Sequence, residues 1–169
     1  MTTTAHETMI QFFTDDEWPF SPIENSTAIS TGFHGDVGKW QCFANVREAQ
    51  RQFIFYSVCP LAAPPEKLAQ VTEFITRANY GMIVGNFELD YSDGEVRYKT
   101  SIAFGAEPLS ATLIKEAVYN NIAIMDEYLP GLLAILMSAV TPAEAIALME
   151  EGEAVKLPDG ESLAEGTGS

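Results

Sequence analysis

The sequence is short of positive charge and has no long apolar run. Nine Lys and Arg residues stand against 24 Asp and Glu residues, which gives a formal net charge of −15. A chain this acidic repels a phosphate backbone and an anionic lipid surface, so we expect neither nucleic acid nor a membrane as a partner. The most apolar stretch, residues 129–140, contains Pro130 and Gly131 and is too short to span a bilayer. The first residues carry no basic-then-apolar signal.

Cysteine and histidine are scarce too, with only Cys42, Cys59, His6 and His34 in the chain. There is no CxxC pair, and no Cys or carboxylate near either histidine has metal-ligand spacing, so we expect no metal and no cofactor. We assign both cysteines to strands, where we expect reduced, unreactive thiols in a cytoplasmic protein. The sequence also lacks GK[ST] and G-x-S-x-G motifs. No residue is predicted to be catalytic, and we expect the protein not to be an enzyme.

The acidic residues are concentrated at the two ends of the chain. Residues 1–38 hold six acids and no Lys or Arg, and residues 150–169 hold six acids and one Lys. The remaining twelve acids and eight bases leave the middle close to neutral. A length of 169 residues is typical of a single domain. We predict one α+β domain over residues 1–152 and a disordered acidic tail over residues 153–169.

The first half of the chain reads as a helix, three strands and a second helix. Thr4 and Glu7 form a capping-box pattern that opens a helix ending near Thr14. Three strand-like runs follow a proline-containing loop, at residues 26–31, 37–47 and 52–58. The last run is apolar on both faces, which indicates either a central strand or a covered outer face. Pro64 and Pro65 then open a helix whose apolar stripe is typical of core packing.

The stretch from 79 to 102 reads as a β-hairpin. In one register the expected pairs are Leu89–Val96, Glu88–Arg97, Phe87–Tyr98 and Ile83–Ile102. Residues 91–94 then form a four-residue loop in which Gly94 is free to take a positive φ. Gly85 is interpreted as a place where another part of the protein packs closely against the strand. Neither a calcium loop nor a nucleotide-binding loop fits this stretch, because the residues around its glycines do not supply the required ligands.

Helices are predicted for the rest of the chain. Ser110 caps a long helix, which Pro130 should break or kink before a second apolar segment. Thr141 and Glu144 form a capping box for the last helix, which Gly152 should stop. The predicted fold class is therefore α+β, with an antiparallel sheet of about five strands and helices packed on it. Its order is helix, three strands, helix, two strands and C-terminal helices.

These residues resemble those of the YbjN family of bacterial sensory transduction regulators. The resemblance rests on a helix that ends in Asn79, on a set of hairpin residues, on Asp126 and Pro130-x-Leu132, and on the DEWPF segment at 16–20. The hairpin residues are Gly85, Asn86, Phe87, Leu89, Asp90, Asp93, Gly94 and Val96. The resemblance covers roughly residues 5–150 and implies a fold similar to that of type III secretion chaperones. It implies no catalytic residue, and its fold relatives bind extended peptide segments, commonly as dimers.

An aromatic surface on the sheet is the predicted binding site. Its residues are Trp40, Phe43, Phe53, Phe55 and Tyr56. If the helices at 110–128 and 131–140 leave part of the sheet uncovered, a homodimer or a protein or peptide client would supply the cover. This predicts a chaperone-like adaptor or regulator that binds proteins. The alternative is a small-molecule sensor with a pocket between the sheet and the C-terminal helices.

Overall fold

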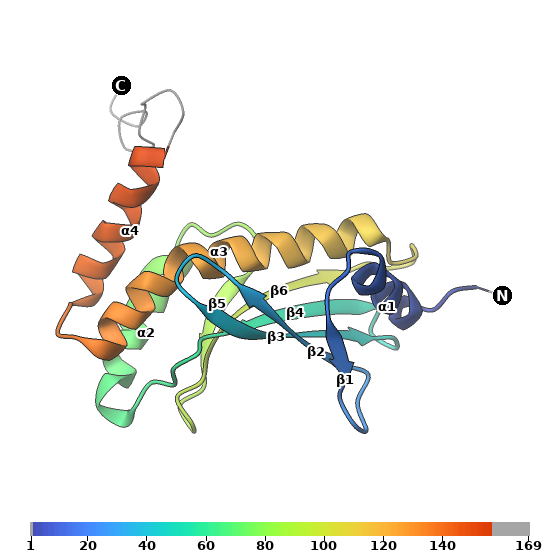
Figure 1. Cartoon of the computed structure of the whole chain (residues 1–169), viewed down its shortest axis with the longest axis horizontal. Coiled ribbons are helices and arrows are strands. Elements are labelled where there is room, and N and C mark those ends of the chain that lie inside the picture. The colour runs from blue at the N-terminus through green and yellow to red at the C-terminus, as the bar shows by residue number, and fades with distance from the viewer. Residues whose placement is uncertain (1, 157–169) are drawn as a thin grey trace.

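A six-stranded antiparallel sheet with four helices forms the protein (Figure 1), whose structure is a computed structural model. The structure describes residues 2–156 and places the side chains of residues 2–149. The elements are α1 (Ala5–Asp15), β1 (Phe20–Pro22), β2 (Ile29–His34), β3 (Lys39–Arg47), β4 (Gln52–Val58), a short 3₁₀ turn (Pro65–Lys67), α2 (Leu68–Asn79), β5 (Asn86–Leu89), β6 (Val96–Ala103), α3 (Ala111–Met137) and α4 (Pro142–Lys156). The predicted α+β class and antiparallel sheet are confirmed.

The strands lie in the order β1-β2-β3-β4-β6-β5. Every neighbouring pair is antiparallel, and α2 connects β4 to β5 on the far side of β6. The strand at 52–58 is therefore central, between β3 and β6, which is one of the two arrangements that its apolar faces indicated. Figure 1 shows α3 running along one side of the sheet, with α1 near one end of α3 and α2 near the other.

The helices pack against one face of the sheet. On β3, Trp40, Cys42, Ala44 and Val46 are buried while the residues between them are partly or fully exposed. On β4 the buried positions are Phe53, Phe55 and Ser57. These residues point toward α1, α2 and α3, because a strand directs successive side chains to opposite faces. We call this side the covered face and the other side the open face.

Asp126 joins the turn between β2 and β3 to α3. Its Oδ1 accepts a hydrogen bond from the backbone N–H of Asp36 at 2.9 Å. Gly35 lies so close that a Cβ there would stand 2.1 Å from the same oxygen. The turn therefore requires glycine at position 35, because any side chain there would collide with the Asp126 carboxylate.

Most of the hairpin prediction is confirmed. Phe87 lies opposite Tyr98, Glu88 opposite Arg97 and Leu89 opposite Val96. The pair Ile83–Ile102 is wrong, because β5 begins only at Asn86 and Ile102 pairs with Phe53 on β4. Gly85, at a φ of 78°, turns the chain away from the sheet, and a Cβ there would lie 2.4 Å from the Lys99 carbonyl oxygen.

Two strand predictions need correction. The sheet has a sixth strand, β1, inside a segment expected to be a loop, and β2 spans 29–34 instead of 26–31. The strand β1 has three residues and ends at Pro22, which has no N–H to donate. Pairing with β2 holds it in the sheet, and its own sequence carries little strand signal.

The helix ends are also partly corrected. Thr4 and Glu7 form the predicted capping box, and Thr141 and Glu144 make its reciprocal bonds at the start of α4. Of the predicted break or kink at Pro130, the break is wrong, because α3 continues to Met137, and the kink stays a prediction. Buried residues on both sides of the proline, among them Leu129 and Leu132, keep this part of α3 packed in the core. The predicted stop at Gly152 is wrong as well, since α4 runs to Lys156. The rest of the predicted tail, residues 157–169, lies outside the described residues.

Gly94 gives a test of this hairpin. Its φ is 78°, and an added Cβ would lie 2.0 Å from the Ala63 carbonyl oxygen, so we expect Gly94→Ala to lower the free energy of unfolding by about 3 kcal/mol. Gly105 is the control, because its φ is also positive but nothing lies within 4 Å of an added Cβ. Gly105→Ala should lower the free energy of unfolding by only about 1 kcal/mol. Urea unfolding of the two variants measures both values. Equal losses for the two variants would contradict the close contact with Ala63.

Candidate functional site

The structure divides the five predicted aromatic residues between the two faces of the sheet. Trp40, Phe53 and Phe55 lie on the covered face with exposed fractions of 3%, 0% and 0%. Phe43 and Tyr56 lie on the open face and are half-buried. The surface that can meet a partner therefore includes two of the five residues.

The three covered residues have partners inside the protein. The Trp40 indole donates a hydrogen bond from Nε1 to Ser57 Oγ at 2.9 Å. The ring of Phe55 stacks on Phe13 of α1, with the ring centroids 6.3 Å apart. Phe53 belongs to the same hydrophobic core. These contacts join the sheet to the helices, so truncation of any of the three would disturb the core before it disturbed a surface.

The open face is organised in rows across the strands. One row runs Ser30, Phe43, Tyr56, Lys99, Asn86, and the next runs Gly32, Gln41, Val58, Arg97, Glu88. Ile54 lies two residues before Tyr56 on β4 and also faces this side. An apolar centre formed by Phe43, Ile54, Tyr56 and Val58 is thus bordered by charged residues. In the described part of the chain, the helices that contact the sheet lie on the other side.

Charged groups hold the border of this apolar centre in place. The guanidinium carbon of Arg97 lies 4.2 Å from the centre of the Tyr56 ring, a cation–π contact. Glu88 pairs with Arg97 at 3.2 Å and with Lys99 at 2.6 Å. Burial raises the pKa of Glu88, but the hydrogen bonds from Lys99 and Arg97 outweigh it and hold the pKa below its ordinary value. The carboxylate therefore stays ionised between its two cations.

A cavity of about 330 Å³ lies on the open face above β4 and β6. Its lining includes Arg47, Gln52, Ile54, Tyr56, Lys99 and Ser101. The cavity thus combines two cations, an amide, a hydroxyl and an apolar floor, and no carboxylate belongs to its lining. Arg47 donates to Gln52 Oε1 at 3.1 Å, which holds its guanidinium beside the cavity.

The two edges of the sheet are closed to an added strand. Asn79, at the end of α2, accepts the Phe87 N–H with Oδ1 at 2.7 Å and donates Nδ2 to the Phe87 carbonyl at 3.1 Å. One amide side chain thus occupies both outward hydrogen-bonding groups in the middle of the edge strand β5. The other edge, β1, has only three residues and includes Pro22. Short or blocked edges of this kind disfavour pairing with another chain.

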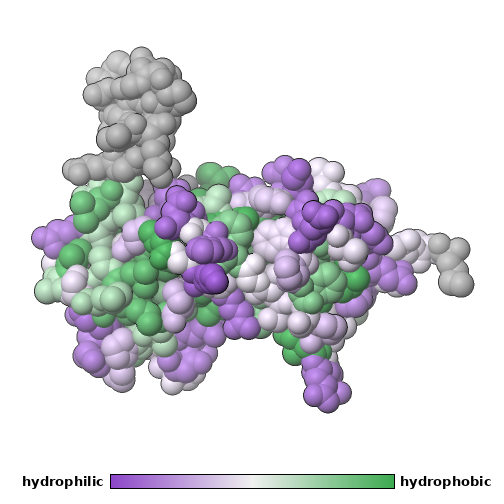
Figure 2. All heavy atoms as spheres, viewed as in Figure 1, coloured by the Kyte–Doolittle hydropathy of each residue, from purple (hydrophilic) through white to green (hydrophobic). Residues whose placement is uncertain are grey.

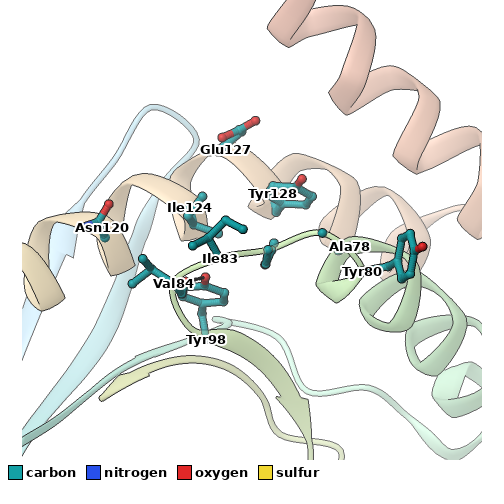
Figure 3. Close-up of a pocket in the computed structure, with 11 residues that line it drawn as sticks. Ala78, Tyr80, Ile83, Val84, Tyr98, Asn120, Ile124, Glu127 and Tyr128 are labelled. Carbon is teal, nitrogen blue, oxygen red and sulfur yellow. Dashed lines mark hydrogen bonds between the residues drawn. The ribbon is translucent and has the colours of Figure 1, made fainter. Parts of the chain in front are cut away.

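A second cavity, of about 390 Å³, lies between α3 and the loop that joins α2 to β5. Figure 3 shows this loop passing between Tyr98 of the sheet and Asn120, Ile124, Glu127 and Tyr128 of α3. The Tyr98 hydroxyl donates to the Val84 carbonyl and so holds the loop, while burial raises the pKa of Tyr98 to about 12. Ile83 at the rim is 94% exposed, so the loop side of this cavity is open to solvent.

Hydrophobic surface is unevenly distributed over the side of the molecule that Figure 2 draws. Figure 2 shows hydrophobic residues gathered toward the end of the molecule that carries α2, while the loops that project from the sheet away from α3 are hydrophilic. Sequence reasoning found the aromatic residues of β3 and β4. It missed the cavity cations Arg47 and Lys99, although each alternates with apolar residues along its own strand, β3 or β6, which was a usable signal.

Cys42 and Cys59 do not form a nucleophilic site. Burial raises the pKa of each thiol to about 11, although hydrogen bonds from Ser57 and Trp40 partly oppose the shift for Cys42. Among residues 2–156, no group of three or more His, Cys, Asp and Glu side chains is placed to hold a metal ion. No helix within the same range is long and apolar enough to cross a membrane.

The chain matches one protein family and is similar to several solved structures. Residues 5–134 match the model of the YbjN family, described as "Putative bacterial sensory transduction regulator". The crystal structure of YbjN from E. coli, "a putative transcription regulator", is similar with a TM-score of 0.57 at 11% identity, over 72% of this chain and 85% of that one. No curated protein is significantly similar in sequence.

Two solved complexes contain chains with a more distant likeness. A chain of the HopA1–SchA chaperone–effector complex has a TM-score of 0.43 at 15% identity, over 70% of this chain and 87% of that one. A chain of the ExsC–ExsE complex has a TM-score of 0.47 at 11% identity, over 77% of this chain and 96% of that one.

The thiols provide a prediction about reactivity and pH. At about pH 8 both should resist a thiol reagent such as DTNB in the native protein and react at once after unfolding. Unfolded thiols ionise near pH 9 and the folded ones near 11. The unfolded state therefore loses protons first, so the free energy of unfolding should fall as the pH rises through this window. Rapid labelling of the native protein at pH 8 would contradict the burial of the thiols.

Proposed function

The chain belongs to the YbjN family, and we propose that it is a noncatalytic protein-binding module of regulatory or chaperone-like type. In this proposal the protein acts in the cytoplasm and holds a segment of a client protein on the open face of its sheet. The family description supports a regulatory role, and the open face supplies a surface on which a partner can be held.

The apolar centre of the open face is the observation that carries the proposal. An antiparallel sheet that faces only water normally has polar residues on that side. Here Phe43, Ile54, Tyr56 and Val58 are adjacent across β3 and β4 and are only partly buried. A partner that covers them would remove apolar surface from water, at about 25 cal/mol for each Å² buried.

The closed edges support binding through side chains on the face. A client that added a strand to the sheet would need free N–H and carbonyl groups along an edge. Asn79 occupies these groups at Phe87, and the opposite edge ends at Pro22. The partner in this proposal therefore lies across the open face and is recognised by the side chains there.

Site-specific photo-crosslinking in the native bacterial host tests this proposal. A photoreactive phenylalanine analogue at Tyr56 should give discrete adducts of higher mass, which mass spectrometry of the adducts can assign to a partner. The matched control places the same analogue at Leu113, which is 37% exposed on α3, the helix on the other side of the sheet. Adducts at both positions alike, or at Leu113 alone, would count against the open face as the binding surface.

A small-molecule sensor is the second candidate function, and the cavity beneath the loop at 80–84 is the observation that favours it. Tyr98, Asn120 and Glu127 bring polar groups to an otherwise largely apolar lining. The exposed rim at Ile83 reduces how completely a ligand would be enclosed. This makes the cavity a weaker basis for a function than the open face.

Thermal-shift measurements test the sensor. This candidate predicts that a low-mass fraction of the host cytosol raises the Tm of the protein, because a ligand that binds only the native state stabilises it. Ile124→Trp, which places a larger side chain in the cavity lining, should abolish that rise. Ile54→Val on the open face is the control and should leave it unchanged. A rise that survives in the Ile124 variant would place the ligand elsewhere.

A further inference from the structure

The cavity above β4 and β6 is the most specific feature of the open face. Its lining joins the basic side chains of Arg47 and Lys99 to the apolar surface of Ile54 and Tyr56. Across its strands, the open face carries four Lys and Arg side chains and one carboxylate, Glu88, so it keeps a net positive charge although Glu88 pairs with Lys99 at 2.6 Å. A site of this kind favours a ligand that is both anionic and apolar.

We infer that this cavity binds an acidic segment of the client protein, in which carboxylate side chains flank an apolar residue. The carboxylates meet Arg47 and Lys99, and the apolar residue rests on Ile54 and Tyr56. This inference rests on the proposed function and adds the chemical class of the partner. It gives Arg47 and Lys99 a role in the specificity of binding.

The geometry of the sheet sets the spacing of the acidic residues. Arg47 lies in the row of Gln52 and Ala103, and Lys99 lies four residues from Ala103 along β6. At about 3.3 Å for each residue, the two rows are about 13 Å apart. Arg47 and Lys99 also lie two strands apart, on either side of β4, so the segment runs along β4 between them. In that direction an extended segment covers the roughly 13 Å in about four residues, and residues four apart point to the same side. The expected pattern is therefore two acidic residues four apart with an apolar residue midway.

Charge also argues against a second copy of this chain as the occupant. A symmetric pair of open faces would bring two surfaces of the same net positive charge together. Like charges brought together in this way oppose association. Glu88 lies on the same face but is already paired with Arg97 and Lys99 at 3.2 and 2.6 Å. An acidic segment of a different protein meets no such conflict.

Fluorescence anisotropy with designed peptides tests the inference. The probe is a labelled extended peptide with two glutamates four residues apart and a leucine midway, and Ser and Thr elsewhere. Two companion peptides have glutamine or lysine in place of both glutamates. The full chain should bind the glutamate peptide at least about tenfold more tightly than the glutamine peptide, and the lysine peptide most weakly.

Charge reversal separates recognition from stability. Arg47→Glu should lower the affinity for the glutamate peptide by about tenfold or more. It should raise the affinity for the lysine peptide, because the new carboxylate attracts it. Lys115→Glu is the matched control, since it makes the same change on α3, away from the open face, and should alter neither affinity. A variant that merely unfolds would bind neither peptide and would therefore show no gain in affinity for the lysine peptide.

Three results would overturn the inference. They are an absence of binding by the glutamate peptide, equal affinity for the three peptides, and a solution mass of about twice 18.5 kDa that Arg47→Glu reduces to one chain. The last result would identify a second copy as the occupant. If photo-crosslinking at Tyr56 succeeds while Arg47→Glu has no effect, the protein-binding role stands and the acidic specificity fails. If Tyr56 gives no adduct, the proposed function itself fails.

Discussion

The junction between α3 and the two central strands determines where the other helices can pack. Asn121 of α3 donates to the carbonyls of Phe55 at 3.1 Å and Tyr98 at 3.0 Å, while Thr100 donates its hydroxyl to the Ala117 carbonyl at 2.8 Å. All of these side chains are buried, and a buried polar group without its partner costs roughly 1–3 kcal/mol. A shift of α3 along the sheet would break the whole set. The helix therefore has one position, and α1 and α2 contact it on the same side of the sheet.

The one-sided placement of the helices gives the open face its character. Central strands such as β4 are apolar on both sides, so a single layer of helices leaves Ile54 and Tyr56 at the surface. Because Asn79 and Pro22 obstruct the two edges, the backbone of the sheet would take little part in the proposed recognition. That recognition would depend on side chains whose positions the strand registers fix.

Local patterns in the sequence predicted the parts of the fold that depend on near neighbours. The register from Phe87 to Leu89, the caps at Thr4 and Thr141, and the positive φ of Gly94 each involve residues close in the chain. The pairing of β1, the continuity of α3 through Pro130 and the covered side of the sheet depend on distant segments. Strand alternation already places Trp40 and Phe43 on opposite faces, as it does Phe55 and Tyr56. It does not say which face the helices cover, so all five aromatics remained candidates.

The cavity cations also show why a total charge is a poor guide to a single site. At physiological ionic strength, exposed charges more than about 8 Å apart are largely screened from one another. Most of the 24 acids would therefore have little influence on a carboxylate bound in the cavity, whereas Arg47 and Lys99 line it. The same screening limits what the cavity can attract from afar. Cations beside an apolar floor would suit a short segment with few charges.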